Sequence, residues 1–307
     1  MPVAWINPTF VDAAEASVSL KDAGLLHAAG CFTTMRAHHG RVFRLADNLQ
    51  RLRDSCEALM VPLPADDATL SNALHELLRR NALQDARVRL TVTRGTTLDD
   101  PDAADGKRLT PTAFATAAAF MPYPAEFYET GMRVVLLTEQ KKNPYDLQAG
   151  HKTLDYLSQF AALKEAARHG AGEALWFDVH NYLACASVAN VFVFVDGELL
   201  TPPTPWDLRD PAVADATPYN RSAVLPGVTR KVALEAAVAA GVPARPEAID
   251  VNRLLGATEV FLTNSVMGVM PVTGIERHTV GTGGPGPVTR KLRVELARMI
   301  EAETAAG

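Results

Sequence analysis

The chain is organised around the stretch Gly150-His151-Lys152-Thr153-Leu154-Asp155-Tyr156-Leu157. It joins a polar loop to a segment whose apolar spacing predicts a helix over 153–169. Lys152 is expected at that junction, where its amine can enter a pocket. Lysine forms Schiff bases with carbonyl compounds when a pocket lowers its pKa. Most lysines are solvated surface charges, so the catalytic interpretation needs partners elsewhere in the chain.

Composition limits the classes of protein that fit. The 307 residues are 48% hydrophobic and 21% charged, which is ordinary for one large domain or two smaller ones. The net charge of −5 gives no basic footprint for nucleic acid, and no apolar run approaches the roughly 20 residues that cross a membrane. The N-terminus lacks signal-peptide features, and Cys31, Cys56 and Cys185 are too widely spaced for a disulfide framework or a zinc site. We therefore expect a cytoplasmic protein without a metal.

Alternating and helical periodicities predict an α/β chain of two domains. In the first part, strands are expected over 3–6, 16–20, 42–45, 87–93 and 113–120, helices over 46–60 and 67–81, and a surface loop over 98–111. Pro122 and Pro124 forbid regular pairing and indicate a linker. We expect a small domain over 1–120, a linker over 121–130 and a larger domain over 131–307 that carries Lys152. Strands over 133–138, 174–178, 182–186, 191–195 and 260–263 and a helix ending at 240 belong to the larger domain.

Eight short motifs follow one another in order. They lie at 30–36, 43–45, 48–52, 152–157, 189–192, 225–230, 259–265 and 270–272. Together they resemble the fold-type IV pyridoxal-phosphate enzymes, the class IV aminotransferases, which include branched-chain and D-amino-acid aminotransferases and 4-amino-4-deoxychorismate lyase. The motifs at 30–34, 50–52 and 270–272 are most similar to those of the lyase. The resemblance covers nearly the whole chain and implies two α/β domains with pyridoxal phosphate between them, in a homodimer.

The resemblance also implies roles for single residues. It makes Lys152 the Schiff-base lysine that holds the cofactor and then moves the α-proton of the substrate. Arg51 falls on the phosphate-binding arginine, whose guanidinium suits a phosphate dianion. Val228 and Thr229 begin a helix, where free N–H groups favour an anion.

Two further cofactor positions leave alternatives open. Ser265 occupies the second hydroxyl-bearing phosphate position, and a turn residue is the other interpretation. Tyr156 is expected one helical turn from Lys152, where its phenol would approach the 3′-oxygen of the cofactor. A core tyrosine is the alternative.

The family places a glutamate five residues before Asn190, and here that position is Cys185. The carboxylate keeps the pyridine nitrogen protonated, so the ring accepts electrons from the α-carbon. A thiol with a pKa of about 8.5 is a poor substitute. We favour a small buried Cys185 and a ring nitrogen without a charged partner. The alternatives are chemistry that needs less electron withdrawal, or an acid that reaches the ring from elsewhere.

Substrate binding departs from the family as well. Asp99 stands where the lyases and D-amino-acid enzymes carry a carboxylate-binding arginine, and Ala28-Ala29 replaces a Gly-Asp pair. His27, Thr33 and Arg94 are the candidate substrate residues, each with a structural alternative.

Three functions remain open for an enzyme acting on a small amino substrate. The first is β-elimination like that of aminodeoxychorismate lyase, which the motifs at 30–34 favour and Asp99 and Cys185 oppose. The second is transamination of an amino acid or amine. The third is a cofactor-binding homologue with little turnover, which the missing glutamate permits.

Overall fold

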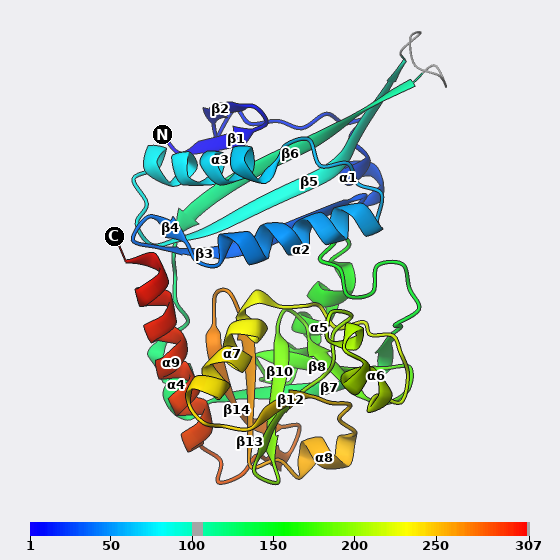
Figure 1. The fold of residues 1–307 in the computed structure, drawn as a ribbon, viewed down its shortest axis with the longest axis vertical. Coiled ribbons are helices and arrows are strands. Elements are labelled where there is room, and N and C mark those ends of the chain that lie inside the picture. The colour runs from blue at the N-terminus through cyan, green and yellow to red at the C-terminus, as the bar shows by residue number, and fades with distance from the viewer. Residues whose placement is uncertain (100–106, 306–307) are drawn as a thin grey trace. The chain divides into compact units, whose positions relative to one another are not determined.

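The computed structural model describes residues 1–99 and 107–305 and divides the chain into two compact units. The first unit contains residues 1–121, residues 152–155 and the chain from Ile300 onward. The second contains residues 122–151 and 156–299. Each unit combines helices with one β-sheet (Figure 1), which confirms the predicted α/β class.

The first unit is built on a six-stranded antiparallel sheet in the order β2-β1-β6-β5-β3-β4. Its elements are β1 (Val3–Ile6), β2 (Thr9–Asp12), α1 (Ala23–His27), β3 (Gly30–His38), β4 (Arg41–Val42), α2 (Leu45–Ala58), α3 (Asp67–Arg80), β5 (Ala86–Asp99) and β6 (Lys107–Ala119). Helices α2 and α3 lie along the sheet (Figure 1).

Alternation along β5 determines which face of this sheet is buried. Val88, Leu90 and Val92 are fully buried in a core that includes leucines of α2 and α3, such as Leu52 and Leu74. Side chains two residues apart share a face of a strand, so the intervening residues point away from this core. Polar side chains on β5 are thereby presented at the opposite face.

The second unit is built on a nine-stranded mixed sheet in the order β12-β11-β10-β13-β14-β7-β8-β9, with β15 beside β14. Its strands are β7 (Met132–Lys142), β8 (Glu173–Asp178), β9 (Leu183–Ala186), β10 (Asn190–Val195), β11 (Glu198–Thr201), β12 (Ala244–Pro246), β13 (Glu259–Asn264), β14 (Gly268–Ile275) and β15 (His278–Thr279). Its helices are α4 (Ala125–Thr130), α5 (Leu157–Arg168), the 3-10 helix η1 (Asp207–Arg209), α6 (Pro211–Asp215), α7 (Val228–Ala239), α8 (Val251–Leu255) and α9 (Pro287–Thr304), whose last turn belongs to the first unit.

Strand β8 shows why this sheet forms where the sequence predicts it. All six of its residues are buried, as expected for a strand covered on both faces. Trp176 packs with Ala162 and Ala166 of α5, while Leu175 joins the core that contains Val191. A hairpin joins β10 to β11, with left-handed backbone at its turn residues Asp196 and Gly197, a pair typical of such turns.

Several boundaries differ from the predictions. Residues 152–155 pack with the first unit rather than with the larger C-terminal domain, and the helix expected from 153 begins at Leu157. The expected linker contains α4, and residues 122–130 belong to the second unit. Residues 16–20 form no strand. The expected loop over 98–111 is replaced at its ends by strand, and its centre lies outside the described residues.

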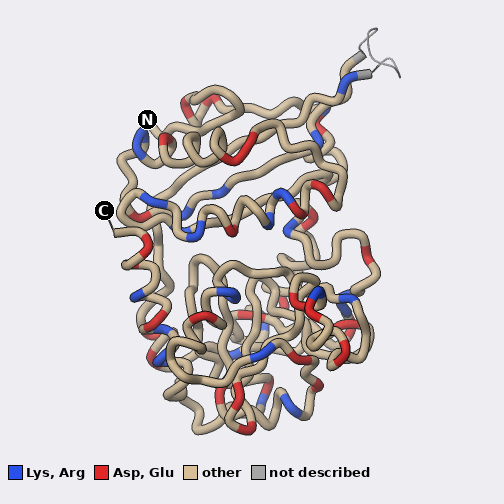
Figure 2. The backbone as a smooth tube through the Cα atoms, in the orientation of Figure 1, with Lys and Arg blue, Asp and Glu red and all other residues tan. Residues whose placement is uncertain are grey.

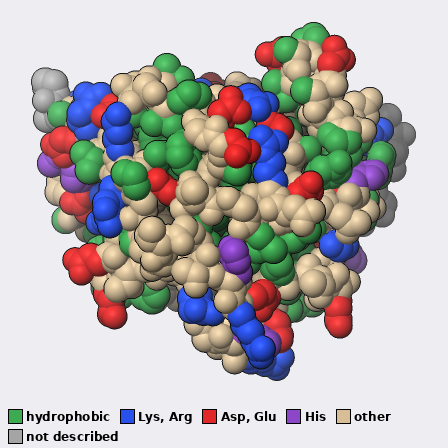
Figure 3. Space-filling view, turned by 90° about the horizontal axis from the view of Figure 1, so that it is seen from below, with side chains coloured by type: hydrophobic (Ala, Val, Ile, Leu, Met, Phe, Trp, Pro, Cys, Tyr) green, Lys and Arg blue, Asp and Glu red, His purple; other side chains and the backbone are tan. Residues whose placement is uncertain are grey.

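Charges of both signs alternate along each unit (Figure 2), and on the face in Figure 3 charged side chains lie among the apolar ones. Within residues 1–99 and 107–305, every helix is too short or too polar to cross a membrane.

Candidate active site

Lys152 lies in an extended segment that pairs with the beginning of β3. The Phe32 N–H donates to the carbonyl of Lys152 (2.9 Å), and the Leu154 N–H donates to that of Gly30 (3.0 Å). Between them, Cys31 and Thr153 form an antiparallel bridge. A Cβ at Gly30 would lie 2.6 Å from the carbonyl oxygen of Val92 and 2.7 Å from Leu154 Cδ1, so glycine permits this close approach. The backbone of Lys152 is therefore fixed by sheet-like pairing.

Two arginines and one aromatic ring surround the Lys152 amine. Its Nζ lies 4.7 Å from the centre of the Phe32 ring, and Arg89 Cζ lies 3.5 Å from the same centre. Burial lowers the pKa of Lys152 to about 7, with further contributions from the positive charges of Arg51 and Arg89. A large fraction of the amine is therefore neutral and nucleophilic at neutral pH.

Arg51 is held rigidly within the first unit. It is only 6% exposed, and its Nη2 donates to Thr33 Oγ1 (2.9 Å) and Asn48 Oδ1 (3.3 Å). The Thr33 hydroxyl in turn donates to Asn48 Oδ1 (2.9 Å). These contacts with Thr33 and Asn48 orient the guanidinium, whose planar set of N–H donors suits an anion.

The start of α7 in the second unit provides a second anion-binding element. Gly227 is the N-cap and has no side chain to occupy the N–H groups of the first turn, which begins with Val228 and Thr229. A Cβ at Gly227 would lie 1.9 Å from Asn190 Oδ1, and Asn190 Nδ2 donates to the carbonyl of Leu225 (2.9 Å). First-turn N–H groups that no side chain caps, on a helix of twelve residues, favour an anion at this position.

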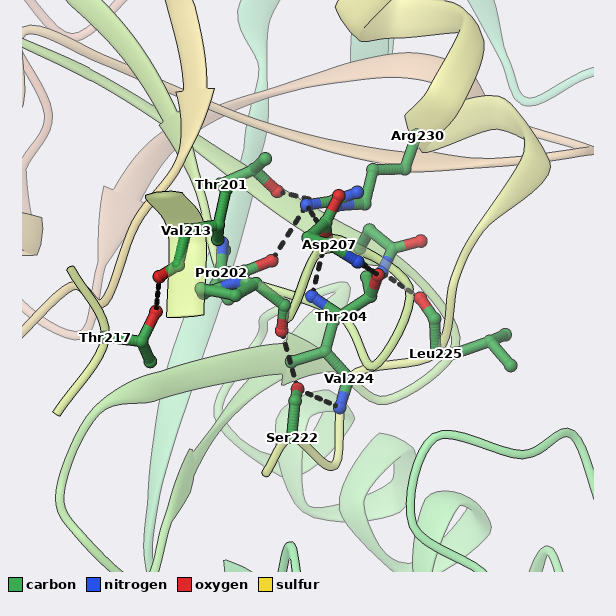
Figure 4. A network of polar contacts seen from close by, with 12 residues as sticks. Thr201, Pro202, Thr204, Asp207, Val213, Thr217, Ser222, Val224, Leu225 and Arg230 are labelled. Atoms are coloured by element: carbon green, nitrogen blue, oxygen red, sulfur yellow. Dashed lines mark hydrogen bonds and ion pairs between the residues drawn. The ribbon is translucent and has the colours of Figure 1, made fainter. Parts of the chain in front are cut away.

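A buried polar network fixes the orientation of this helix (Figure 4). Arg230, in the first turn of α7, donates to Thr201 Oγ1 (3.1 Å), to the carbonyl of Pro202 (3.0 Å) and to Asp207 Oδ2 (2.8 Å). Asp207 Oδ2 also accepts from the N–H and the hydroxyl of Thr204 (both 2.7 Å). The network anchors the helix N-terminus to the chain that follows β11.

Cys185 lies on β9, opposite Trp176 in the register with β8. Burial raises the pKa of its thiol; the positive charge of Lys142 opposes this shift and the negative charge of Glu173 adds to it. The thiol is therefore neutral at neutral pH. Asp178, the nearest acid in the sequence, already accepts from the backbone N–H groups of His180 (2.9 Å) and Tyr182 (3.0 Å) and from the Tyr219 hydroxyl.

Glu173 is a buried acid that the sequence analysis did not identify. It is 1% exposed, and its carboxylate accepts from the N–H groups of Ser187 (2.9 Å), Ala174 (3.2 Å) and Val188 (3.3 Å). These bonds favour the charged form, but burial outweighs them and raises the pKa of Glu173 to about 7. Its bonds to the β9–β10 connection indicate a structural role.

The remaining predicted residues have different environments. Thr33 is fully buried and its hydroxyl serves Arg51 and Asn48, so it orients Arg51. His27 is exposed at the end of α1, and Arg94 is exposed and donates to the carbonyl of Met60 (2.9 Å). Their role in binding substrate stays a prediction.

The resemblance to the class IV aminotransferases assigns Tyr156 and Ser265 to the cofactor. Tyr156 precedes α5 and makes an edge contact with Phe160, 6.0 Å between ring centres. Since residues 152–155 are not helical, the expected spacing of one helical turn from Lys152 is wrong. Ser265 lies in the turn after β13, where Asn264 Oδ1 accepts from the N–H groups of Val266 and Met267 (both 2.8 Å).

The structure thus brings Lys152, Arg51 and Thr33 together in the first unit, and it adds Phe32 and Arg89. Arg89 carried a sequence signal: it is a charged residue flanked by Val88 and Leu90 in an alternating strand. Such a position faces away from the core, and pairing with β3 places it near Phe32.

The chain is similar in sequence to known proteins over nearly its whole length. The Amino-transferase class IV family model matches residues 30–275. A putative branched-chain-amino-acid aminotransferase of Methanocaldococcus jannaschii is 30% identical over 289 residues, which cover 94% of this chain and 93% of that protein. The branched-chain-amino-acid aminotransferase of Escherichia coli K12 is 27% identical over 98% of this chain and 93% of its own length. The D-alanine aminotransferase of Staphylococcus haemolyticus is 26% identical over 99% of this chain and 100% of its own length.

Solved structures share the fold over nearly the whole chain. The crystal structure of Escherichia coli branched-chain amino acid aminotransferase superposes with a TM-score of 0.85 at 26% identity, covering 98% of this chain and 95% of that one. The branched-chain amino acid aminotransferase of Thermobaculum terrenum, in its pyridoxal-phosphate form, gives a TM-score of 0.81 at 21% identity, covering 98% and 94%. These matches confirm the predicted fold-type IV architecture.

Proposed function

Because this chain belongs to the class IV aminotransferases, we propose that it is a pyridoxal 5′-phosphate-dependent transaminase of branched-chain L-amino acids. The observation that carries the proposal is the Lys152 amine, whose pKa is lowered to about 7 beside Arg51. The named relatives that act on branched-chain amino acids supply the substrate class.

The residues present fit the aldehyde and the phosphate of this cofactor. A neutral lysine amine suits the aldehyde, and a fixed guanidinium and an uncapped helix N-terminus suit a phosphate dianion. When bound, the cofactor forms a covalent link through its aldehyde and withdraws electrons from the substrate α-carbon.

Each residue then has a defined task. Lys152 would hold the aldehyde and would carry the proton that leaves the substrate α-carbon. Arg51 and the N–H groups of Val228 and Thr229 would hold the phosphate, and Ser265 is assigned a further phosphate contact. Thr33 orients Arg51.

Cys185 is where the fit is incomplete. The thiol is neutral, so it does not supply the negative charge that would hold a proton on the ring nitrogen. Lys142 places a positive charge near the same position, which opposes protonation further. Deprotonation of the substrate α-carbon is therefore expected to be slower than with a carboxylate at this position.

The aminodeoxychorismate lyase function that the motifs favoured has no support among the relatives named above, which are transaminases by name. Transamination, the alternative considered from the sequence, agrees better with them. A homodimer and a cytoplasmic location stay predictions.

Amino-donor assays test the proposal. We expect the cofactor-loaded protein to convert L-leucine, L-isoleucine or L-valine and 2-oxoglutarate to the branched-chain 2-oxo acid and glutamate. D-Alanine as the only effective donor would contradict the substrate class, and release of pyruvate from aminodeoxychorismate without a 2-oxo acid acceptor would contradict transamination. The Lys152→Ala variant is the matched control in every assay.

A further inference from the structure

A cluster of two histidines and two acids lies at the β3–β4 turn of the first unit, outside the proposed active site. Register pairing of His38 with Arg41 leaves His39 and Gly40 as a two-residue turn, with φ angles of 49° and 72°. Asn, Asp and Gly are the residues preferred in such a turn. Histidine at the first position is uncommon and costs conformational energy, which directs attention to what its side chain does.

Both imidazoles contact one carboxylate from the last turn of α9. His38 Nε2 lies 2.8 Å from Glu301 Oε2, and His39 Nε2 lies 3.1 Å from Glu301 Oε1. One ligand atom from each of the three residues lies within 4.8 Å of the others. His38 is partly buried, and His39 and Glu301 are exposed, so the cluster is open to ions from solution.

The other ring nitrogen of His38 is also occupied. Its Nδ1 contacts a carboxylate oxygen of Asp85, the residue that precedes β5. A carboxylate on one ring nitrogen fixes the orientation and tautomer of a histidine and directs the other nitrogen toward a metal. Asp85 is therefore placed to fix the orientation and tautomer of His38, as carboxylates beside zinc-binding histidines do.

We propose that His38, His39 and Glu301 form a binding site for Zn²⁺, with Asp85 as the supporting carboxylate. Two imidazoles and a carboxylate are a ligand set that zinc accepts, with bonds of about 2.0–2.2 Å and a fourth position for water. A tetrahedron with such bonds separates its ligand atoms by roughly 3.3 Å. The observed separations of 2.8 and 3.1 Å from Glu301 need only small side-chain movements to match.

The chain offers a matched control for a simple histidine–carboxylate pair. His169, the C-cap of α5, has its Nε2 3.0 Å from Glu165 Oε1, nearly the same contact as at Glu301. That pair has one imidazole only, so the proposal predicts no comparable metal affinity there.

Calorimetric titration of the untagged, cofactor-loaded protein with ZnCl₂ tests the site. We expect saturable binding of one zinc ion, at least tenfold weaker in both His39→Asn and Glu301→Gln and unchanged in His169→Asn. The asparagine at position 39 suits the left-handed turn, so in the presence of a chelator this variant should unfold at the same or a higher temperature than the parent protein. Zinc should raise the unfolding temperature of the parent protein and not that of His39→Asn.

Two results would overturn the zinc site. One is the absence of saturable binding by the parent protein up to about 1 mM zinc. The other is equal affinity in the parent protein and in both folded variants, which would leave the cluster as an ion-paired turn.

Discussion

The surroundings of Lys152 and of Cys185 differ in how they use charge. Around Lys152, burial and two arginines lower the pKa of a cation to about 7, and Arg51 remains oriented by neutral partners. Around Cys185, burial keeps a thiol neutral beside Lys142. The first region is suited to a carbonyl and an anion, whereas the Cys185 thiol supplies no negative charge to a protonated pyridine.

The difference between the two regions separates attachment of the cofactor from activation of the substrate. Covalent attachment of the cofactor depends on the amine and its anion-binding partners, whereas electron withdrawal depends on the protonation of the ring. Substitutions of the anion-binding residues around Lys152 should therefore alter affinity for the cofactor, and a substitution at Cys185 should alter turnover. Lys152 itself serves both properties.

The largest effect is expected at Lys152. Lys152→Ala removes both the covalent partner of the aldehyde and the group that carries the α-proton, so turnover should fall at least about 10³-fold. Steady-state transamination measures this loss. Substantial activity in the variant would show that Lys152 is not the lysine that carries the reaction.

Arg51 should affect affinity for the cofactor. Arg51→Met removes charge-assisted hydrogen bonds of about 1.5–3 kcal/mol, which corresponds to roughly 10–150-fold weaker binding of pyridoxal phosphate. Equilibrium dialysis against the apoprotein gives the dissociation constant.

Thr33→Val is the matched probe of how Arg51 is held. It keeps the shape and removes the hydrogen bonds that the Thr33 hydroxyl makes with Arg51 and Asn48. Because these bonds affect the cofactor only through the orientation of Arg51, a loss of about 1 kcal/mol, or roughly fivefold in affinity, is expected. If Arg51→Met bound pyridoxal phosphate as tightly as the parent protein, the phosphate assignment would be wrong.

Cys185→Glu tests whether a negative charge at position 185 increases turnover. A carboxylate at this position should favour a protonated ring and raise the transamination rate by about tenfold, equivalent to about 1.4 kcal/mol in the barrier. Cys185→Gln, of similar size and without charge, should give no increase. Equal rates in the two variants would mean that the thiol belongs to a different, working arrangement.

A further effect is expected on stability near Cys185. Burial raises the pKa of Glu173 from 4.5 to about 7, so between these values the folded protein binds more protons than the unfolded chain. Stability should therefore fall as pH rises through this window, by at most about 1.4 kcal/mol per pH unit. Glu173→Gln should abolish this contribution in denaturant titrations at pH 5 and 7. An unchanged slope would mean that Glu173 stays charged.

Local periodicity predicts the helices and strands whose apolar residues all lie on one buried face. Helix α3 follows from Leu70, Leu74 and Leu77, all nearly fully buried, and β5 follows from its alternating valines and leucine. The expected strand over 16–20 has the right alternation, but its residues are exposed on both sides and pair with no strand in the described structure.

The environment of Lys152 could not be predicted from local sequence, because residues far apart in the chain form it. Thr153 is drawn into extended backbone by Cys31, more than a hundred residues earlier, which overrides the helical pattern that begins near it. Arg89 lowers the pKa of Lys152 because β5, which carries Arg89, pairs with β3, beside which Lys152 lies. The motifs identified Lys152 and Arg51 from their spacing, but not the physical reason for the reactivity of the lysine.

Borohydride reduction followed by peptide mapping tests the central claim most directly. Reduction fixes pyridoxal phosphate to the lysine that binds its aldehyde, and the label survives proteolysis. We predict a single labelled peptide that contains Lys152 and no label in Lys152→Ala. A label on another lysine, or no label in the cofactor-treated parent protein, would contradict the assignment of Lys152.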